Sequence, residues 1–366
     1  MVVPYRADQV GSLLRPAEVL EARAAYAEGR VELAQLREAE DRAILDALEM
    51  QRQIGIDIFT DGEMRRDAWM STLADAVDGF IDEYQIRHWH KLDGSTENEP
   101  SRAKIAAGKL RQVRRLTAHD ASFLQQHAPG PFKITMPSPV TISYSGYQAG
   151  VTDKVYPTRE QLLDTLVPII KSELQALARE GVSYIQLDEG FSGYVGEAWR
   201  GQLERLGLEP AKVLEADIAA ENACYDALPR DRIVLGIHIC RGNSKSRWGR
   251  IGGYDWLAEQ VFSSLNVDRF LLEYDSDRAG SFEPLRFVPK GKIVVLGLVT
   301  TKHGQPEPQD ELMRQIDRAS KYLPLDQLAL SPQCGFASVS EGNLLSVDDQ
   351  HRKLELVVDT ARKVWG

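Results

Sequence analysis

Cysteine is scarce in this sequence: its 366 residues include three, at positions 224, 240 and 334. So small and odd a count excludes a disulfide framework, and in a reducing compartment each cysteine is buried, catalytic or a metal ligand. No apolar run approaches the length of a membrane span, and the first residues lack the apolar centre of a signal peptide. We therefore expect a soluble, cytoplasmic protein with no membrane partner.

Basic charge is also in short supply. Lysine and arginine number 44 against 54 aspartates and glutamates, which gives a net charge of −10. The sequence shows no basic patch of the kind that binds nucleic acid, so we expect no nucleic-acid partner. A composition of 43% hydrophobic and 27% charged residues is ordinary for a globular protein and supplies a sizeable core.

The sequence does contain a regular alternation of apolar runs and amphipathic stretches. The predicted strands lie at 7–12, 56–63, 132–139, 182–190, 232–240, 269–275, 292–299 and 328–336. Alternating strands and helices predict a parallel sheet, and continuous apolar strands predict burial on both faces. Eight such units favour a closed (β/α)8 TIM barrel over an open sheet, and no GxGxxG follows the first run. We expect residues 1–366 to form this barrel as a single catalytic domain.

One segment, residues 78–118, breaks the alternation. Its turn-rich stretch DGSTENEP lies between two extended stretches, which predicts a β-hairpin inserted after the second strand. The hairpin carries His88 and His90, which share a strand face. No cysteine or strand-end carboxylate lies beside them, so we interpret both as solvated or packed within the hairpin.

Polar residues gather where the predicted strands end, which is where barrels of this type hold their reactive groups. His238 and Cys240 lie two apart at the end of the fifth run, Glu273 lies in the sixth and Cys334 in the eighth. An imidazole, two thiolates and a carboxylate make a full tetrahedral zinc shell. The alternative is a set of packed polar residues without a metal, which is our interpretation of Cys224 in its helical pattern.

Six short stretches extend this pattern to a family. They are VGSLLRP (10–16), TDGE (60–63), IQLDEG (185–190), HICRGN (238–243), EYDSDR (273–278) and PQCGF (332–336). Together they resemble the catalytic barrel of cobalamin-independent methionine synthase, and the chain as a whole is similar to the short, single-barrel members. The most specific element is the combination of HxC with PxCG.

The resemblance implies a zinc-dependent methyltransferase that converts homocysteine to methionine. It implies that the metal ligands are His238, Cys240, Glu273 and Cys334. It assigns the substrate amino group to Glu63 and Asp188, the substrate carboxylate to Gly11 and Ser12, and catalysis to Asp188 and His303, the latter as proton donor to the leaving group.

The resemblance leaves the methyl donor open. In full-length members a tryptophan after PVTI packs against folate, whereas Ser145 falls at that position here, with Tyr144 beside it. The donor is therefore a methylfolate, a corrinoid protein or another compound. The alternative functions are alkyl transfer to another thiol such as coenzyme M, a zinc hydrolase with Asp188 or Glu189 as base, and a metal-free barrel similar to uroporphyrinogen decarboxylase.

Overall fold

The centre of the molecule is a parallel sheet of six strands in the order β3-β4-β5-β6-β7-β8. The computed structural model describes residues 5–226 and 228–366. The strands are β3 (Lys133–Pro137), β4 (Tyr184–Asp188), β5 (Val234–Ile239), β6 (Arg269–Glu273), β7 (Ile293–Val299) and β8 (Leu328–Pro332). All their residues are buried, which explains why these runs are mostly apolar in the sequence.

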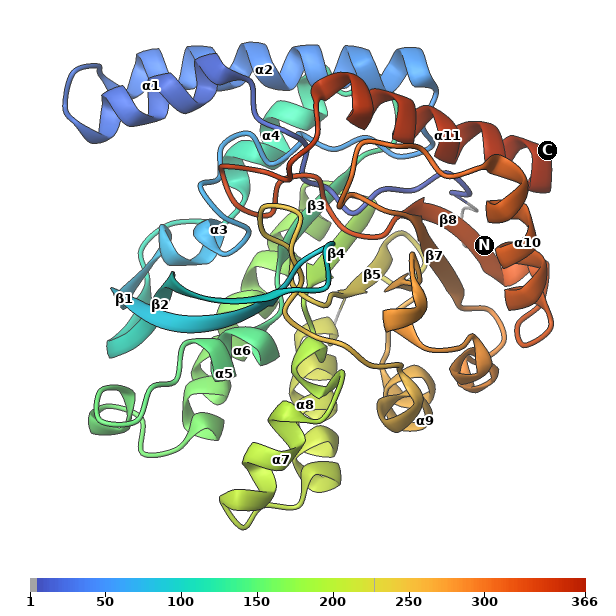
Figure 1. The fold of residues 1–366 in the computed structure, drawn as a ribbon. Coiled ribbons are helices and arrows are strands. Elements are labelled where there is room, and N and C mark those ends of the chain that lie inside the picture. The colour runs from blue at the N-terminus through green and yellow to red at the C-terminus, as the bar shows by residue number, and fades with distance from the viewer. Residues whose placement is uncertain (1–4, 227) are drawn as a thin grey trace.

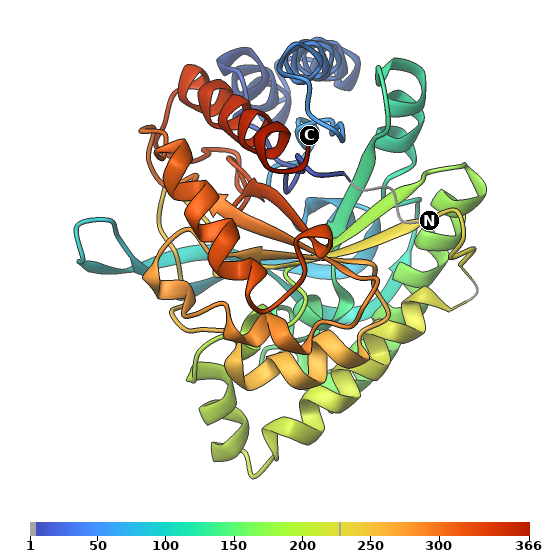
Figure 2. The same ribbon diagram turned by 90° about the vertical axis from the view of Figure 1, so that its right-hand side faces the viewer.

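Helices surround this sheet, as Figures 1 and 2 show. They are α1 (Ala17–Ala27), α2 (Leu33–Ile54), α3 (Ser71–Ala74), α4 (Ala118–His127), α5 (Pro139–Ser145), α6 (Arg159–Arg179), α7 (Ala198–Arg205), α8 (Pro210–Tyr225), α9 (Asp255–Ser264), α10 (Gln309–Ser320) and α11 (Val347–Trp365). Helices lie between most successive strands along the chain, and between β6 and β7 the chain forms only short 3-10 turns. The predicted α/β fold with a parallel sheet is thus confirmed. No helix in the described part of the chain is both long and apolar enough to cross a membrane.

The first two expected strands, 7–12 and 56–63, differ from the prediction. Each makes only an isolated parallel bridge: Ala7 pairs with Leu330 of β8, and Phe59 pairs with Phe132 just before β3. The two segments therefore lie at the two edges of the six-stranded sheet without forming continuous strands.

Side chains replace the missing backbone ladder in this region. The Asp57 carboxylate accepts hydrogen bonds from the N–H groups of Arg6 and Ala7, at 2.6 and 2.9 Å. Gln51 of α2 accepts from the N–H of Thr60 and donates to its carbonyl, both at 2.9 Å. Backbone groups that already bond to side chains are not free for strand pairing. The apolar periodicity of the sequence does not reveal which side chains compete for these backbone groups.

A separate two-stranded antiparallel sheet follows α3. It consists of β1 (Val77–His90) and β2 (Thr96–Gln112), and Figure 2 shows its tip projecting from the body of the molecule on the left. The tip contacts the loop after β5, because the backbone groups of His90 and Trp248 exchange hydrogen bonds of 2.7 and 3.2 Å. His88 is exposed and bonds Asn98, and the His90 ring stacks on Trp248.

A buried ionic cluster joins several strand segments. Asp8 Oδ1 lies 2.9 Å from Lys133 Nζ, which also donates to Gln186 Oε1 at 2.7 Å. Tyr184 donates to Asp8 Oδ2 at 3.0 Å, and Arg269 lies 3.4 Å from the same oxygen. Burial alone would raise the pKa of Asp8, but the two cations outweigh it and hold that pKa below its usual value.

Candidate metal centre and adjoining cavity

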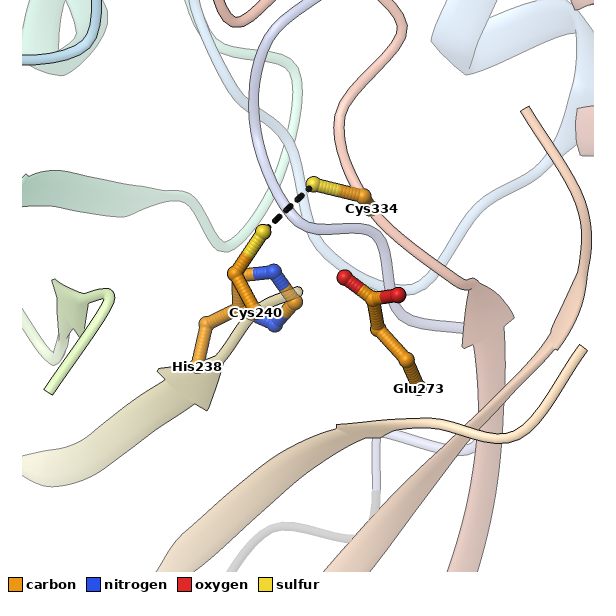
Figure 3. A group of neighbouring side chains, drawn as sticks. All are labelled: His238, Cys240, Glu273 and Cys334. Carbon is orange, nitrogen blue, oxygen red and sulfur yellow. Dashed lines mark hydrogen bonds between the residues drawn. The ribbon is translucent and has the colours of Figure 1, made fainter. Parts of the chain in front are cut away.

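Four potential metal ligands meet at the carboxyl ends of the strands. His238 lies on β5 and Cys240 directly follows it, Glu273 ends β6, and Cys334 lies two residues after β8. One donor atom from each residue lies within 4.8 Å of the others, and all four residues are buried (Figure 3). Three strands that are neighbours or near neighbours in a parallel sheet thus bring these residues together across almost 100 positions of sequence.

Two potential metal-binding atoms of this cluster accept no hydrogen bond from the described residues. The Nδ1 atom of His238 lies 3.1 Å from the carbonyl oxygen of Leu271, which favours the tautomer with the proton on Nδ1 and a lone pair on Nε2. Among the described residues neither that Nε2 atom nor Oε2 of Glu273 has a hydrogen-bond partner, and Arg278 Nη2 lies 3.6 Å from the latter oxygen. Buried polar atoms are normally satisfied, so two orphaned acceptors beside two thiols fit a bound cation.

The two thiols are electrostatically suited to a soft metal. Cys240 Sγ and Cys334 Sγ lie 3.5 Å apart, and the N–H of Gly242 points at Cys240 Sγ at 3.1 Å. The hydrogen bond from Cys240, together with His238 and against the effect of burial, lowers the pKa of Cys334 to about 6. The thiolate is the form of cysteine that binds metal, and a thiol with such a pKa is mostly thiolate at neutral pH. The Cys334 thiolate in turn raises the pKa of His238 to about 9 despite burial, and metal binding would release such protons.

Arg241 supports the cluster and was missed at the sequence level. Its backbone N–H donates to Glu273 Oε1 at 2.9 Å, which fixes one carboxylate oxygen, while Arg278 Nη2 lies 3.6 Å from the other. Its buried guanidinium group bonds the Glu273 carbonyl and the Tyr254 hydroxyl, at 3.0 and 2.8 Å. The only hint in the sequence is a charged residue directly after HxC, which does not reveal what it bonds.

A cavity of about 480 Å³ adjoins the cluster. Among the sequence-predicted residues, its lining contains Ser12, Glu63, Asp188, His238, Cys240 and Cys334. The structure therefore gathers candidate metal ligands and expected substrate contacts around one space. Ser145, the residue at the position of the tryptophan of full-length relatives, also lines this cavity.

Glu63 and Asp188 give the cavity an excess of negative charge. Glu63 adopts a left-handed backbone with φ of 57°, and its Oε1 accepts from Thr135 Oγ1 at 2.8 Å while Oε2 is buried without a partner. Arg66 Nη1 lies 3.3 Å from Glu63 Oε1. Asp188 accepts from Gln186 Nε2 at 2.7 Å, and burial together with the charge of Glu63 raises its pKa to about 7. Such a pair of carboxylates favours a cationic ligand group.

Glycine is required next to these carboxylates. A Cβ atom at Gly11 would lie 2.9 Å from Thr135 Cγ2 and 3.2 Å from Glu63 Oε1, and one at Gly335 would lie 2.0 Å from Ser12 Oγ. Side chains at either position would displace the groups that line the cavity. Gly11 thus lies against Glu63, and Ser12 lies against Gly335, whereas their expected contact with a substrate carboxylate stays a prediction.

The structure does not bring His303 to this site. His303 is exposed and does not line the cavity. Its neighbour Lys302 turns inward instead, is fully buried and donates to Asn243 Oδ1 at 2.5 Å. The imidazole of His303 is exposed and lies outside the cavity lining, so the structure lends no support to its predicted role as a proton donor.

The hairpin forms the outer wall of the cavity, which the sequence did not indicate. Arg87 and Trp89 of β1 and residues 99–104 of β2 are among the lining residues. Ion pairs tie this wall to the loop after β5, where Arg247 lies 3.2 Å from Glu97. The cavity therefore lies between the strand ends and the hairpin.

Comparison with known proteins shows the family to which the sequence is similar. A family model described as "Cobalamin-independent synthase, Catalytic domain" matches residues 6–363. Two proteins of Bacillus subtilis strain 168, named as uncharacterized proteins YxjH and YxjG, are each 38% identical over 369 residues, covering 99% of this chain and 95% of theirs. A methionine synthase of Pyrococcus abyssi is 25% identical over 331 residues, which cover 89% of this chain and 84% of that protein.

Solved structures show the same fold. A Listeria monocytogenes protein, provisionally described as a vitamin-B12 independent methionine synthase, superposes with a TM-score of 0.75 at 28% identity, covering 100% of this chain and 99% of its own. A B12-independent methionine synthase of Shewanella sp. W3-18-1, in complex with selenomethionine, gives a TM-score of 0.75 at 20% identity and covers 98% and 97%. The latter likeness concerns the fold alone.

Proposed function

Because this chain belongs to the family of cobalamin-independent methionine synthase catalytic domains, we propose that it is an S-methyltransferase that converts homocysteine to methionine. Family membership supports methyl transfer to a thiol. The observation that carries the finer proposal is the cluster of two thiols, an imidazole and a carboxylate beside a cavity with two further carboxylates.

The cofactor we propose is zinc, held by His238, Cys240, Glu273 and Cys334. When bound, zinc lowers the pKa of a coordinated thiol, so that its sulfur is a thiolate at neutral pH. Two cysteinates and an imidazole already neutralise a divalent ion, which keeps an added thiolate electron-rich. Sites with three imidazoles are more cationic and suit the activation of water instead.

Glu63 and Asp188 would hold the amino group of the substrate. An ammonium group between the two carboxylates would relieve their mutual repulsion and would return the pKa of Asp188 towards its usual value. The same charge disfavours coenzyme M, because its sulfonate would face two anions. The backbone at Gly11 and the hydroxyl of Ser12 would receive the substrate carboxylate on the same side of the cavity.

In the proposed reaction the substrate sulfur forms a bond to the methyl carbon while the bond from that carbon to the donor breaks. The electron pair of the broken bond stays with the donor. The thiol proton is lost before the transfer, and Asp188, which lines the same cavity, is our candidate to accept or relay it. Burial of the cluster keeps water away from the reacting sulfur.

The donor candidates are a methylfolate, a methylated corrinoid protein and another methylated compound. At the position where full-length relatives stack folate on tryptophan, Ser145 offers no aromatic ring to the cavity. Tyr144 is not free to replace it, since its hydroxyl bonds Thr141 and the N–H of Gly193 and its ring packs on Trp199.

The fold belongs to the same proposal. We propose that the segments at Ala7 and Phe59 complete an eight-membered barrel between β8 and β3, with residues 1–366 as one domain. Two isolated bridges, Ala7 to Leu330 and Phe59 to Phe132, support closure at these two edges. A hydrogen bond of 3.2 Å from the N–H of Asp57 to the carbonyl of Ala7 supports contact between the two segments themselves.

A donor screen tests the function. The purified, zinc-loaded chain is incubated with homocysteine and, in turn, 5-methyltetrahydrofolate, methylcobalamin and S-adenosylmethionine, and methionine is measured by mass spectrometry. X-ray absorption at the zinc edge should show an added sulfur ligand when homocysteine is present. If homocysteine leaves the zinc coordination sphere unchanged and an ester or amide is cleaved instead, the chain is a hydrolase. Less than about one zinc per chain after careful purification would favour the metal-free alternative.

A further inference from the structure

One cation on the cavity wall has no partner. Five lysine and arginine side chains line the cavity among the described residues: Arg87, Arg102, Lys104, Lys245 and Arg247. The last four each lie 3.0 to 3.5 Å from a carboxylate oxygen. Arg87 alone among them forms no hydrogen bond or ion pair with any described residue.

The register of the hairpin explains why Arg87 is left free. Arg87 stands directly opposite Glu99 on β2, which is the position of a cross-strand ion pair. Glu99 pairs instead with Lys245, at 3.5 Å, and with Arg247, both from the loop after β5. The contact that fastens the hairpin to this loop therefore removes the natural partner of Arg87.

Arg87 is partly buried in this wall and has no carboxylate at ion-pair distance among the described residues. Burial lowers its pKa, Arg250 adds to that effect, and only Glu189 acts in the opposite direction from beyond ion-pair distance. A partly buried charge in a cavity is stabilised when an opposite charge and its hydrogen bonds become available. Trp89, two residues further along β1, lines the same cavity, and its indole N–H has no hydrogen-bond partner among the described residues.

We propose that Arg87 binds an anionic group, a carboxylate or a phosphate, of the methyl donor, so that the donor is a small anionic molecule and not a cationic sulfonium compound. The inference rests on the proposed function, since it names the class of donor for that reaction. The donor and not the thiol is assigned because Arg87 belongs to the hairpin, and the charges that act on it most are Glu189 and Arg250, not the Glu63 and Asp188 pair.

The test compares Arg87→Gln and Arg87→Lys with Arg111→Gln, a control on β2 whose exposed side chain pairs with Asp78 and does not line the cavity. With the donor found in the screen, Arg87→Gln should raise the KM for that donor by about 10- to 100-fold, the usual effect of losing a hydrogen bond to a charged group. The KM for homocysteine should stay within about 3-fold, well below that effect. Arg87→Lys keeps the positive charge but lacks the paired N–H donors of a guanidinium group, so its KM for the donor should lie between those of the wild type and Arg87→Gln. Arg111→Gln should match the wild type.

Several outcomes would overturn the inference while leaving the methyltransferase intact. These are a sulfonium compound or a methylated corrinoid protein as the only donor, a KM effect confined to homocysteine, or no effect at all. If no donor gives methionine, the proposed function fails by itself. Calorimetric titration with 5-methyltetrahydrofolate as the probe then decides the inference: Arg87→Gln must bind it at least 10-fold more weakly than both the wild type and Arg111→Gln. Equal zinc content and thermal unfolding across the variants exclude a folding defect.

Discussion

Each residue of the metal cluster has a specific electrostatic task. His238 is oriented by the Leu271 carbonyl, Glu273 is held through one oxygen by the backbone of Arg241, and the two sulfurs share a hydrogen bond. Two of the four candidate ligands are thus positioned by backbone groups before any ion arrives. Positioning of this kind reduces the reorganisation that metal binding requires.

Cys334→Ser should remove both zinc and activity. A serine hydroxyl does not ionise near neutral pH, so the site would lose one of its two thiolates and the charge that balances a divalent ion. We expect zinc content to fall well below one ion per chain by elemental analysis, with no measurable methyl transfer. Cys224→Ser is the matched control, because Cys224 is also buried but lies on α8 outside the cluster. Retained zinc and activity in Cys334→Ser would remove Cys334 from the site.

Glu63→Gln should weaken homocysteine binding. The change keeps the shape of the side chain but removes one of the two charges proposed to face the substrate ammonium group. We expect the KM for homocysteine to rise about 10- to 100-fold while zinc content is unchanged. Glu341→Gln is the control, since Glu341 lies at the rim of the same cavity with a side chain that is 58% exposed. A KM that rises equally in both variants would contradict a specific role for Glu63.

At this scale the sequence was informative where a residue type restricts chemistry. His238, Cys240, Glu273 and Cys334 follow from ligand preference and strand ends, and the structure places them together. His303 could not be placed in this way, because sequence spacing does not say whether a loop residue turns inward or outward. The loop turns Lys302 inward instead.

At the scale of the elements, α2 does more than cover the sheet. Its buried Gln51 exchanges two hydrogen bonds with the backbone of Thr60 and accepts a third from Gln9 at 2.8 Å. The helix thereby fixes the segment that leads into Glu63. The positions of the helices and most strands were predictable from apolar periodicity. The hydrogen bonds from a helix side chain to the Thr60 backbone, in place of strand pairing, were not predictable, because glutamine in a helix is usually exposed to solvent.

Gln51→Leu tests this contribution. Leucine keeps the bulk but leaves the N–H and carbonyl of Thr60 without partners in a buried position. We expect the free energy of unfolding to fall by about 2–4 kcal/mol, measured by urea denaturation. Gln53→Leu, on the same helix but exposed, should change it by less than about 0.5 kcal/mol. Equal effects of the two substitutions would show that α2 acts through its apolar face alone.

Over the whole molecule, the buried ionic cluster connects the early segment at Asp8 with β3, β4 and β6. Its chain of contacts continues from Lys133 through Gln186 to Asp188 at the cavity. A sequence shows these charges only as interruptions in apolar strands, so their mutual pairing could not be predicted.

Lys133→Met should destabilise the entire fold. The substitution removes a partner of Asp8 and leaves its carboxylate buried with a smaller positive charge nearby. Breaking one partner of a buried pair typically costs about 3–5 kcal/mol in the free energy of unfolding. Lys171→Met is the control, because Lys171 forms a partly exposed pair with Asp226 and should cost less than about 1 kcal/mol. A loss for Lys133→Met no larger than that of the control would show that the cluster is not a stabilising centre.

The 3.5 Å separation of Cys240 and Cys334 also bears on how the protein survives oxygen. Without a metal, two adjacent thiols, one of them acidic, are prone to join as a disulfide once an oxidant reaches them. The bound ion would then protect both thiols from oxidation. If the ion is lost in air, the two cysteines would form a disulfide, and added zinc would not restore the site. Intact mass after chelation in air should show the loss of two hydrogen atoms per chain, restored by dithiothreitol and absent in Cys334→Ser.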